Sequence, residues 1–164
     1  MWWAYFDVTA LVAERALADE PVETRARLAR TAFTFAHLPL VAAIVVTALG
    51  LKKVLEYVSD AEKHDLSDPL KGVALGALVG GVAVYLAAHV VFKWIVTKQV
   101  STVRLCTAAT LLALWAPLTA VPALAQLGVV AAVVVVSLVV ESVIYAEQRH
   151  EIRDRHLHHD HPEA

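Results

Sequence analysis

The sequence predicts an all-α membrane protein: a polytopic transmembrane helix bundle with four spanning helices and an N-terminal partial or interfacial helix. Hydrophobic residues make up 59% of the 164-residue chain, and its mean hydropathy is +0.61, well above that of an ordinary globular protein. Charged residues crowd into a few short stretches, and the apolar runs between them carry almost none. This segregation is typical of helices whose solvent is a lipid bilayer.

Four apolar segments are long enough to cross a hydrocarbon core about 30 Å thick, which takes about 20 residues at about 1.5 Å each. In a soluble protein of this length, four fully apolar helices would leave no amphipathic helices to cover them, which argues against a soluble fold. The predicted spans are residues 31–51, 72–96, 105–125 and 127–146.

The segments between the spans have the composition of loops. Residues 51–71 are charged and polar, and Ser67-Asp68-Pro69 is a helix-start signal with proline in the first turn. The second connection is short, at about residues 97–104, and Pro122 and Gly128 bracket a tight hairpin before the last span. The chain therefore divides into an N-terminal helix and cytoplasmic segment, a four-helix bundle and a charged, His-rich cytoplasmic tail. Their bounds are residues 1–30, 31–147 and 148–164.

Prolines modify two of the predicted spans. Pro39 lies near the start of its helix, where a missing N–H donor matters little. Pro117 and Pro122 lie within the third span, and we expect them to kink it or to shorten it.

Basic residues set the orientation of the bundle. With four spans, the N-terminal region, the second connection and the tail share one side of the membrane. That side carries ten Lys and Arg residues and the other carries four, so the positive-inside rule puts both termini in the cytoplasm. The expected location is the cytoplasmic (inner) membrane. The ten are Arg15, Arg25, Arg27, Arg30, Lys93, Lys98, Arg104, Arg149, Arg153 and Arg155, and the four are Lys52, Lys53, Lys63 and Lys71.

The first twenty residues repeat apolar side chains at helical spacing. This pattern fits an amphipathic helix at the membrane interface, and it equally fits the end of a spanning helix whose beginning is absent. The repeated residues are Trp3, Phe6, Ala10, Ala13 and Leu17.

Two motifs give the chain a resemblance to a known family. They are Trp2-Trp3-Ala4-Tyr5-Phe6-Asp7, and Arg30 followed by His37-Leu38-Pro39 and an apolar helix. Together they resemble the bacterial low temperature requirement protein A (LtrA) family, in which the first motif closes one spanning helix and the second opens the next. The resemblance covers about the first 55 residues, and beyond them it rests on the order of the helices and a glycine-rich second span.

Members of that family are roughly twice this length, with an earlier half whose Phe-Phe-Asp motif is not found here. The resemblance is therefore to the C-terminal half, which fits a fragment, a mis-started reading frame or a naturally short relative. The family is named for a growth phenotype in the cold. The resemblance implies a role in growth or adaptation at low temperature, and it implies no molecular activity.

Three charged or imidazole side chains lie more than one helical turn inside the predicted spans: His37, His89 and Glu141. Such groups are costly in a bilayer and are expected to face the bundle interior. At about 1.5 Å per residue, each lies roughly 8–10 Å below the cytoplasmic edge, and Asp7 could join them from the end of its own helix. The cluster could relay protons or bind a cation. Alternatively, each group hydrogen-bonds a neighbouring helix and fixes its packing.

Glycines recur on one face of the second span. Gly72, Gly76 and Gly80 form a tandem GxxxG motif that Gly81 extends, which favours the close approach of another helix. The expected partners there are the missing N-terminal half or another copy of the chain. A hinge or an ion path at Gly80-Gly81 is the functional alternative.

Other patterns carry less information about function. Aromatic residues near the cytoplasmic boundary indicate an interfacial belt. The tail has the composition of a metal-binding tract, but its spacing matches no closed zinc motif, so we expect no metal and no cofactor. The aromatic residues are Trp2, Trp3, Tyr5, Phe6, Trp94 and Tyr145, and the tail histidines are His150, His156, His158, His159 and His161.

Three classes of function stay open. The first is a structural or stress-adaptive membrane protein, and the second is a transporter or channel component with His37, His89 and Glu141 as its polar site. The third, an enzyme acting on lipid, lacks a convincing nucleophile or metal-ligand set, and motifs of soluble enzymes are absent from the sequence. We therefore expect no enzyme. We also expect no nucleic-acid binding, because the basic residues are loop charges interleaved with acids.

Overall fold

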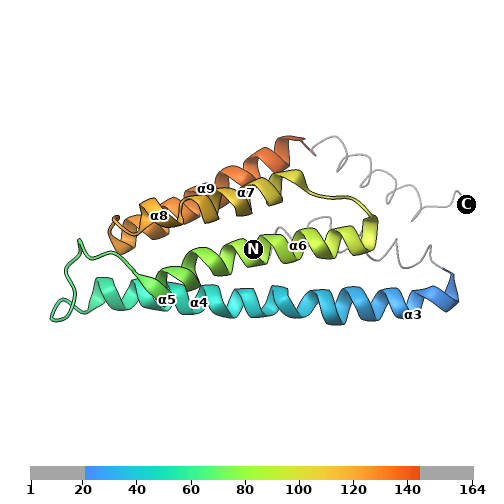
Figure 1. Cartoon of the computed structure of the whole chain (residues 1–164), viewed down its shortest axis with the longest axis horizontal. Coiled ribbons are helices and arrows are strands. Elements are labelled where there is room, and N and C mark those ends of the chain that lie inside the picture. The colour runs from blue at the N-terminus through green and yellow to red at the C-terminus, as the bar shows by residue number, and fades with distance from the viewer. Residues whose placement is uncertain (1–20, 145–164) are drawn as a thin grey trace, which may run out of the picture.

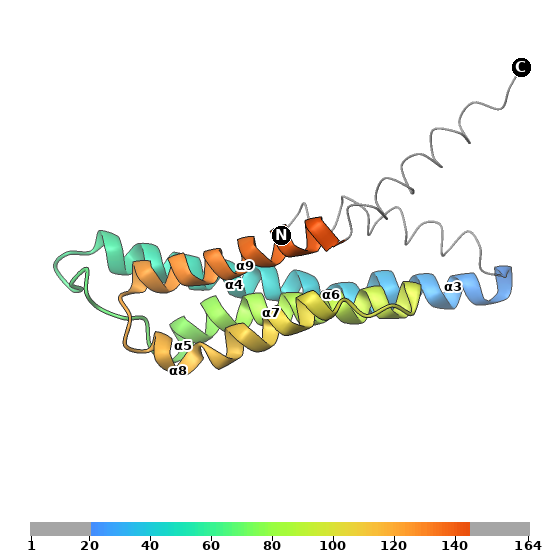
Figure 2. The same ribbon diagram turned by 90° about the horizontal axis from the view of Figure 1, so that it is seen from above.

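The computed structural model describes residues 21–144, and this part of the chain is helical with short connections and no strand. Four rods pack side by side along a common long direction, seen in two views in Figures 1 and 2. The first rod packs against the second and the fourth, and the third also packs against the second and the fourth. The all-α bundle predicted from the sequence is therefore confirmed.

The first rod is a continuous helix from Val22 to Ser59. It consists of α3 (Val22–Arg30), the π-helical segment η1 (Thr31–Ala36) and α4 (His37–Ser59). The predicted span, residues 31–51, is the middle of this helix, so Pro39 lies inside the helix and not near its start. Pro39 cannot donate to the carbonyl of Phe35, and its ring crowds that carbonyl. The wider π-helical turn that contains Phe35 accommodates this defect.

The second rod agrees with its predicted bounds to within one residue. It consists of α5 (Gly72–Leu75), the π-helical segment η2 (Gly76–Gly80) and α6 (Gly81–Thr97). Gly72 begins it with a φ of 54°, a left-handed conformation that glycine adopts without strain. Lys98 ends it in the same left-handed region, with a φ of 58°.

The third and fourth rods form a hairpin whose predicted bounds were wrong. The third comprises α7 (Thr102–Ala113) and the short α8 (Trp115–Leu118), and α9 runs over Ala123–Ile144. The turn therefore lies at residues 119–122, and Gly128 lies inside α9. Pro117 is the cause of the break after Ala113, because its ring crowds the carbonyl four residues earlier. The expected shortening of this span is confirmed.

Three of these helices are long and apolar enough to cross a membrane: Glu23–Ser59, Gly72–Thr97 and Ala123–Ile144. The apolar α7 is shorter. With α8 it extends from Thr102 to Leu118, about 25 Å at about 1.5 Å per residue.

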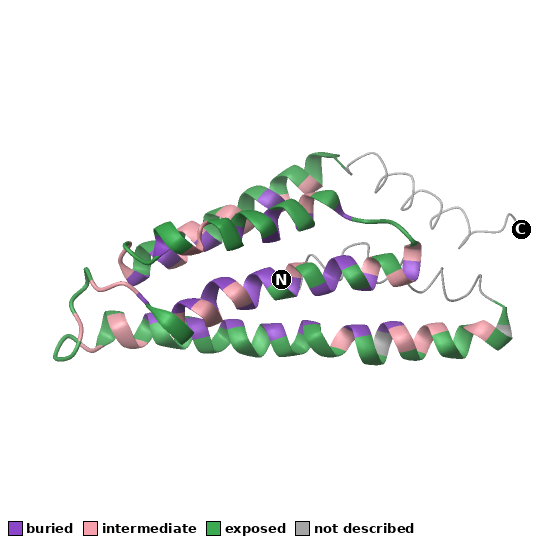
Figure 3. Ribbon diagram, viewed as in Figure 1, coloured by how far each residue is buried: buried purple, intermediate pink, exposed green. Residues whose placement is uncertain are grey.

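Buried residues are concentrated along the second rod, and much of the outer surface of the other rods is exposed (Figure 3). One group of buried residues joins α4, α5, α6, α7 and α9 around Leu75, Leu78 and Leu111, and a second joins η1 and α4 to α6 around Leu40 and Phe92. Large apolar side chains on the outer faces, such as Leu55 on α4 and Val136 on α9, are more than half exposed. Lipid is the solvent that suits these faces.

Two glycines let the first and second rods approach closely. A Cβ atom on Gly50 would lie 2.5 Å from the backbone nitrogen of Leu78, and one on Gly81 would lie 2.6 Å from Oγ1 of Thr47. Neither position has room for a side chain, so the backbones of α4 and the second rod meet here.

The other glycines of the tandem motif have different surroundings. A Cβ on Gly76 or Gly80 would meet the indole ring of Trp115, at 3.0 Å and 3.6 Å respectively. Nothing lies within 4 Å of such an atom on Gly72. In this chain an indole ring of α8 therefore lies over Gly76 and Gly80.

Candidate functional site

An ion pair joins the first turn of α7 to the last turn of α9. Arg104 donates from Nε to Oε2 of Glu141 at 3.1 Å and from Nη2 to the same oxygen at 3.0 Å, and its Nε lies 2.9 Å from Oε1. Ser101 donates from Oγ to Oε1 at 3.2 Å. The side chain of Arg104 is 8% exposed and that of Glu141 is 16% exposed. The carboxylate is therefore held by a charged fork and a hydroxyl, in a largely buried position.

The hairpin brings these residues together because it folds back at Pro122. Thr107 and Ser137 each lie fifteen residues from Pro122, and their hydroxyl oxygens are hydrogen-bonded at 2.7 Å. Arg104 and Glu141 lie eighteen and nineteen residues from it. Antiparallel helices place residues at equal distances from the turn side by side, so the pairing follows from the position of the turn.

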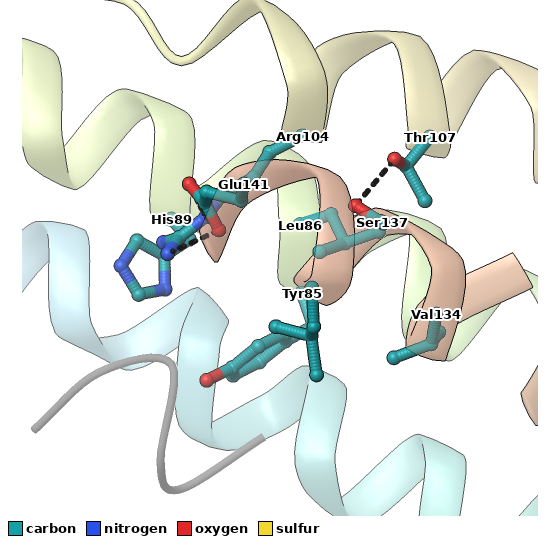
Figure 4. A pocket seen from close by; sticks show the side chains of 9 residues that line it. Tyr85, Leu86, His89, Arg104, Thr107, Val134, Ser137 and Glu141 are labelled. Carbon is teal, nitrogen blue, oxygen red and sulfur yellow. Dashed lines mark hydrogen bonds and ion pairs between the residues drawn. The ribbon is translucent and has the colours of Figure 1, made fainter. Parts of the chain in front are cut away.

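A cavity lies beside this ion pair, between α6, α7 and α9 (Figure 4). Arg104, Thr107, Ser137 and Glu141 line it from the hairpin, and α6 contributes His89, which is fully buried. The remaining lining residues are Tyr85, Leu86, Val134 and Leu138. The cavity thus combines two opposite charges, an imidazole and hydroxyls with an apolar wall.

Two further features of α6 shape the surroundings of the cavity. The His89 ring lies edge-on to Tyr85 and Phe92, with ring centroids 6.0 Å and 6.5 Å away. One turn further along the helix, half-buried Lys93 interacts electrostatically with both Arg104 and Glu141. Charged groups from three helices therefore converge near one end of the bundle.

The structure brings together two residues of the predicted polar layer. His89 and Glu141 line the same cavity. His37 lies on α4, is not among the residues that line the cavity, and has its ring edge-on to Phe92 with the centroids 6.4 Å apart. Arg30 ends α3 in an exposed position, and Pro39 lies in α4. Asp7 and the aromatic motif Trp2, Trp3, Tyr5 and Phe6 lie outside the described residues, as do Tyr145 and the tail histidines.

Sequence reasoning missed Arg104 as a site residue. It was counted among the loop charges that set the orientation, because it precedes the predicted third span by one residue. In the structure it is 7% exposed and pairs with Glu141. The sequence did contain a signal for this pairing, because Arg104 and Glu141 lie at nearly equal distances along the chain from Pro122.

Gln126 was also missed, at the opposite end of the hairpin. Its Oε1 accepts from the Leu70 N–H at 3.1 Å, and its Nε2 donates to the carbonyls of Leu70 at 3.1 Å and Leu118 at 2.7 Å. The predicted spans left residue 126 between them as a loop residue, but it is fully buried. It fastens the loop before α5 to the hairpin and supports the position of α9.

Comparison with known protein families gives a match over most of the chain. The family model described as bacterial low temperature requirement A protein (LtrA) matches residues 1–140, which extends the resemblance of the first 55 residues through most of α9. No curated protein and no solved structure was found to match the chain.

Proposed function

The chain belongs to the bacterial low temperature requirement A protein (LtrA) family, and from this premise we propose that it is a membrane transport component that contributes to growth or adaptation at low temperature. Transport is coupled to protons or to another cation. The family description supports the link to low temperature. The observation that carries the transport role is the Arg104–Glu141 pair beside His89, around one cavity inside an apolar bundle.

Charged groups are an expensive way to hold transmembrane helices together. The hydroxyl pair of Thr107 and Ser137 and the amide of Gln126 join helices in this chain at no cost in buried charge. An ionisable group in a membrane helix is by default a functional hypothesis. The carboxylate of Glu141 keeps some exposure near the end of α9, and the cavity extends from it to Ser137, one turn deeper. A partly exposed carboxylate that opens onto a deeper cavity suits a site that takes up a proton or another cation from one side of the membrane.

The competing explanation is that the ion pair only fastens α7 to α9. Buried ion pairs add little to stability, because desolvation offsets their attraction, but breaking one is costly. Loss of function in a single variant therefore does not separate the two explanations. Exchanging the partners does, because it keeps the pair and changes the position of the acid.

The test measures proton movement in proteoliposomes that contain the full chain and an internal pH dye. A panel of monocarboxylates, amino acids, sugars, amines and monovalent cations is added outside. We expect at least one class to drive proton movement, and Glu141→Gln to reduce it by about tenfold or more, since the glutamine has the same shape and cannot take up the proton. Glu56→Gln is the matched control, because Glu56 is a glutamate on the exposed end of α4.

The exchanged pair, Arg104→Glu with Glu141→Arg, decides between the explanations. A transport site predicts that this double variant folds but moves protons no better than Glu141→Gln. Recovery of full activity by the double variant would support fastening alone. Absence of any Glu141-dependent movement by the folded protein, with every class of solute, would overturn the transport role.

Growth tests the low-temperature role. A strain that lacks the gene should grow more slowly than its parent in the cold and equally well at its optimal temperature. The wild-type gene and Glu56→Gln should restore growth in the cold, and Glu141→Gln should not. A defect of equal size at both temperatures would contradict a specific role in the cold.

We further propose that the bundle lies in the bacterial inner membrane with both termini in the cytoplasm. Burial of Arg104 removes it from the loop charges, which leaves nine basic residues on the cytoplasmic side against four on the other. The positive-inside rule still favours the same orientation. Catalysis and nucleic-acid binding form no part of this proposal.

A further inference from the structure

The first rod extends past the end of the second rod, and this extension is basic. α6 ends at Thr97, and α3 projects beyond it (Figures 1 and 2). The nine residues of α3 span about 13 Å at about 1.5 Å each. They include Arg25, Arg27 and Arg30, with Glu23 as the acidic residue of the helix. A positively charged helix therefore continues directly from a membrane-spanning one.

Two of these arginines lie on the continuation of the face that meets lipid. Leu38 and Val41 are exposed on the apolar outer face of the first rod. Thr34, Arg30 and Arg27 continue this face, each exposed and three or four residues from the one before. Residues at this spacing share one side of a helix, so lipid chains that cover Leu38 and Val41 bring their headgroups beside the arginines. The opposite face packs against α6 through the buried residues Ala32, Ala36, Leu40 and Ala43.

The second rod marks the level of the membrane interface. Trp94 is 52% exposed, and Nζ of Lys98 lies 5.6 Å from the centroid of its indole ring. An exposed indole beside a cation is typical of the boundary between acyl chains and headgroups. The two rods are antiparallel (Figure 1), and the cluster that joins them runs from Ala32 on the first to Val96 on the second. The arginines of α3 therefore lie just beyond this boundary, at the depth of the headgroups.

The other end of the first rod carries exposed cations whose charge is offset. Nζ of Lys52 lies 3.6 Å from Oε1 of Glu56, and Lys53 also pairs with Glu56. The loop that follows, residues 60–71, contains more acidic than basic residues. Charge complementarity for an anionic headgroup is therefore found at the α3 end of the rod.

We propose that Arg27 and Arg30 bind the headgroup of an anionic phospholipid whose acyl chains lie on Leu38 and Val41. The guanidinium groups donate to the phosphate oxygens, and each basic residue beside an anionic membrane surface strengthens binding by about fivefold. The surface lies outside the cavity beside Glu141, so this inference does not depend on the transport role.

The test is titration of the delipidated full chain in detergent with phosphatidylglycerol or phosphatidylcholine of the same acyl chains. Native mass spectrometry counts the bound lipid and gives the dissociation constant of the first one. We expect phosphatidylglycerol to bind about tenfold more tightly than phosphatidylcholine. Arg27→Gln with Arg30→Gln should weaken the binding of phosphatidylglycerol by about tenfold or more and leave that of phosphatidylcholine unchanged.

The matched control is Lys52→Gln with Lys53→Gln. It removes two exposed cations from the other end of the same rod, where Glu56 offsets them, and should change the affinity for phosphatidylglycerol by less than about twofold. Arg27→Lys with Arg30→Lys keeps both charges and should bind within about threefold of wild type. Circular dichroism should show that each variant is folded. If the glutamine pair does not fold, Arg30→Gln alone takes its place, with an expected loss of about fivefold.

Further arms of the titration identify the occupant. Glycerol phosphate carries the charge of the headgroup without acyl chains, and at the same concentration it should not displace the lipid. Displacement by glycerol phosphate, equal affinity for the two lipids, or an equal loss in the lysine control would each overturn the inference. So would a loss with Arg27→Lys and Arg30→Lys as large as with glutamine. A dimer that forms without lipid and is lost in the glutamine variant would assign the surface to a second copy instead and overturn the inference as well.

Discussion

Gln126 shows how much one buried polar side chain can organise at the end of a bundle. It satisfies both backbone groups of Leu70 and the carbonyl of Leu118, and its neighbour Ala123 donates to the carbonyl of Asp68 at 2.9 Å. These contacts connect a loop, α8 and α9 without any charge. Buried backbone groups of this kind are costly to leave without a partner.

Replacing Gln126 by leucine should therefore destabilise the protein. The apolar side chain has a similar volume but leaves both buried backbone groups of Leu70 without partners, for a loss of about 1–3 kcal/mol in the free energy of unfolding. The carbonyl of Leu118 loses one of its two hydrogen bonds and keeps the one from the Val121 N–H. Thermal or denaturant unfolding in detergent measures the loss. Gln99→Leu is the control, because Gln99 is exposed and its substitution should cost less than about 0.5 kcal/mol. Equal effects of the two substitutions would show that the contacts of Gln126 are unimportant.

The hydropathy pattern identifies some of the buried polar residues and misses others. His89 and Glu141 stand out because each is isolated in a long apolar run. Arg104 and Gln126 do not, because each lies beside a predicted span boundary, where a polar residue is expected to face water. Whether such a residue is buried depends on its partner across the hairpin, and this partner is known only once the position of the turn is known.

At the scale of helices, the hydropathy pattern predicts the ends of the second rod correctly and the ends of the hairpin helices wrongly. The second rod begins and ends next to charged residues, so its bounds follow from composition. The hairpin is different because residues 105–140 contain no charge, and the turn at residues 119–122 is nearly as apolar as the helices beside it. Proline geometry locates the turn: Pro117 breaks the helix after Ala113, and α9 begins directly after Pro122.

The contact between α4 and the second rod depends on two glycines, of which only Gly81 was expected from the repeat. Gly50→Ala should push the helices apart, because the new methyl group would lie 2.5 Å from the backbone of Leu78 and no flexible side chain can yield. The expected loss is about 1–3 kcal/mol in the free energy of unfolding, typical of overpacking. Thermal unfolding in detergent measures it.

Gly128→Ala is the matched control for this substitution. Gly128 lies in α9 with nothing within 4 Å of an added Cβ, and alanine favours a helix over glycine by about 1 kcal/mol. Stability should therefore be unchanged or slightly higher. If Gly50→Ala were equally harmless, the close approach of the two helices would not contribute to stability.

For the whole molecule, the distribution of exposed apolar surface identifies the central helix and the lipid-facing ones. In the most apolar window of each span, 56% of residues are buried in Gly72–Thr97, against 11% in Ala123–Ile144. The second rod is thus the centre of the bundle, and α9 presents most of its surface to lipid. The candidate site lies where α6 meets the hairpin, so it is enclosed by the chain itself and not by lipid.

The orientation of this bundle can be tested from its two ends, since the loop before α5 and the turn after α6 lie at opposite ends of the long axis (Figure 1). In a Cys106→Ser background, which removes the exposed native thiol, Lys63→Cys and Lys98→Cys each place one thiol at an exposed position. With both termini cytoplasmic, a membrane-impermeant maleimide should label Lys63→Cys in intact spheroplasts and Lys98→Cys only after the membrane is disrupted. The nine-to-four excess of basic residues is the physical reason. The reverse pattern would invert the bundle and put the partly exposed carboxylate of Glu141 on the periplasmic side, so a proton taken up there would come from outside the cell.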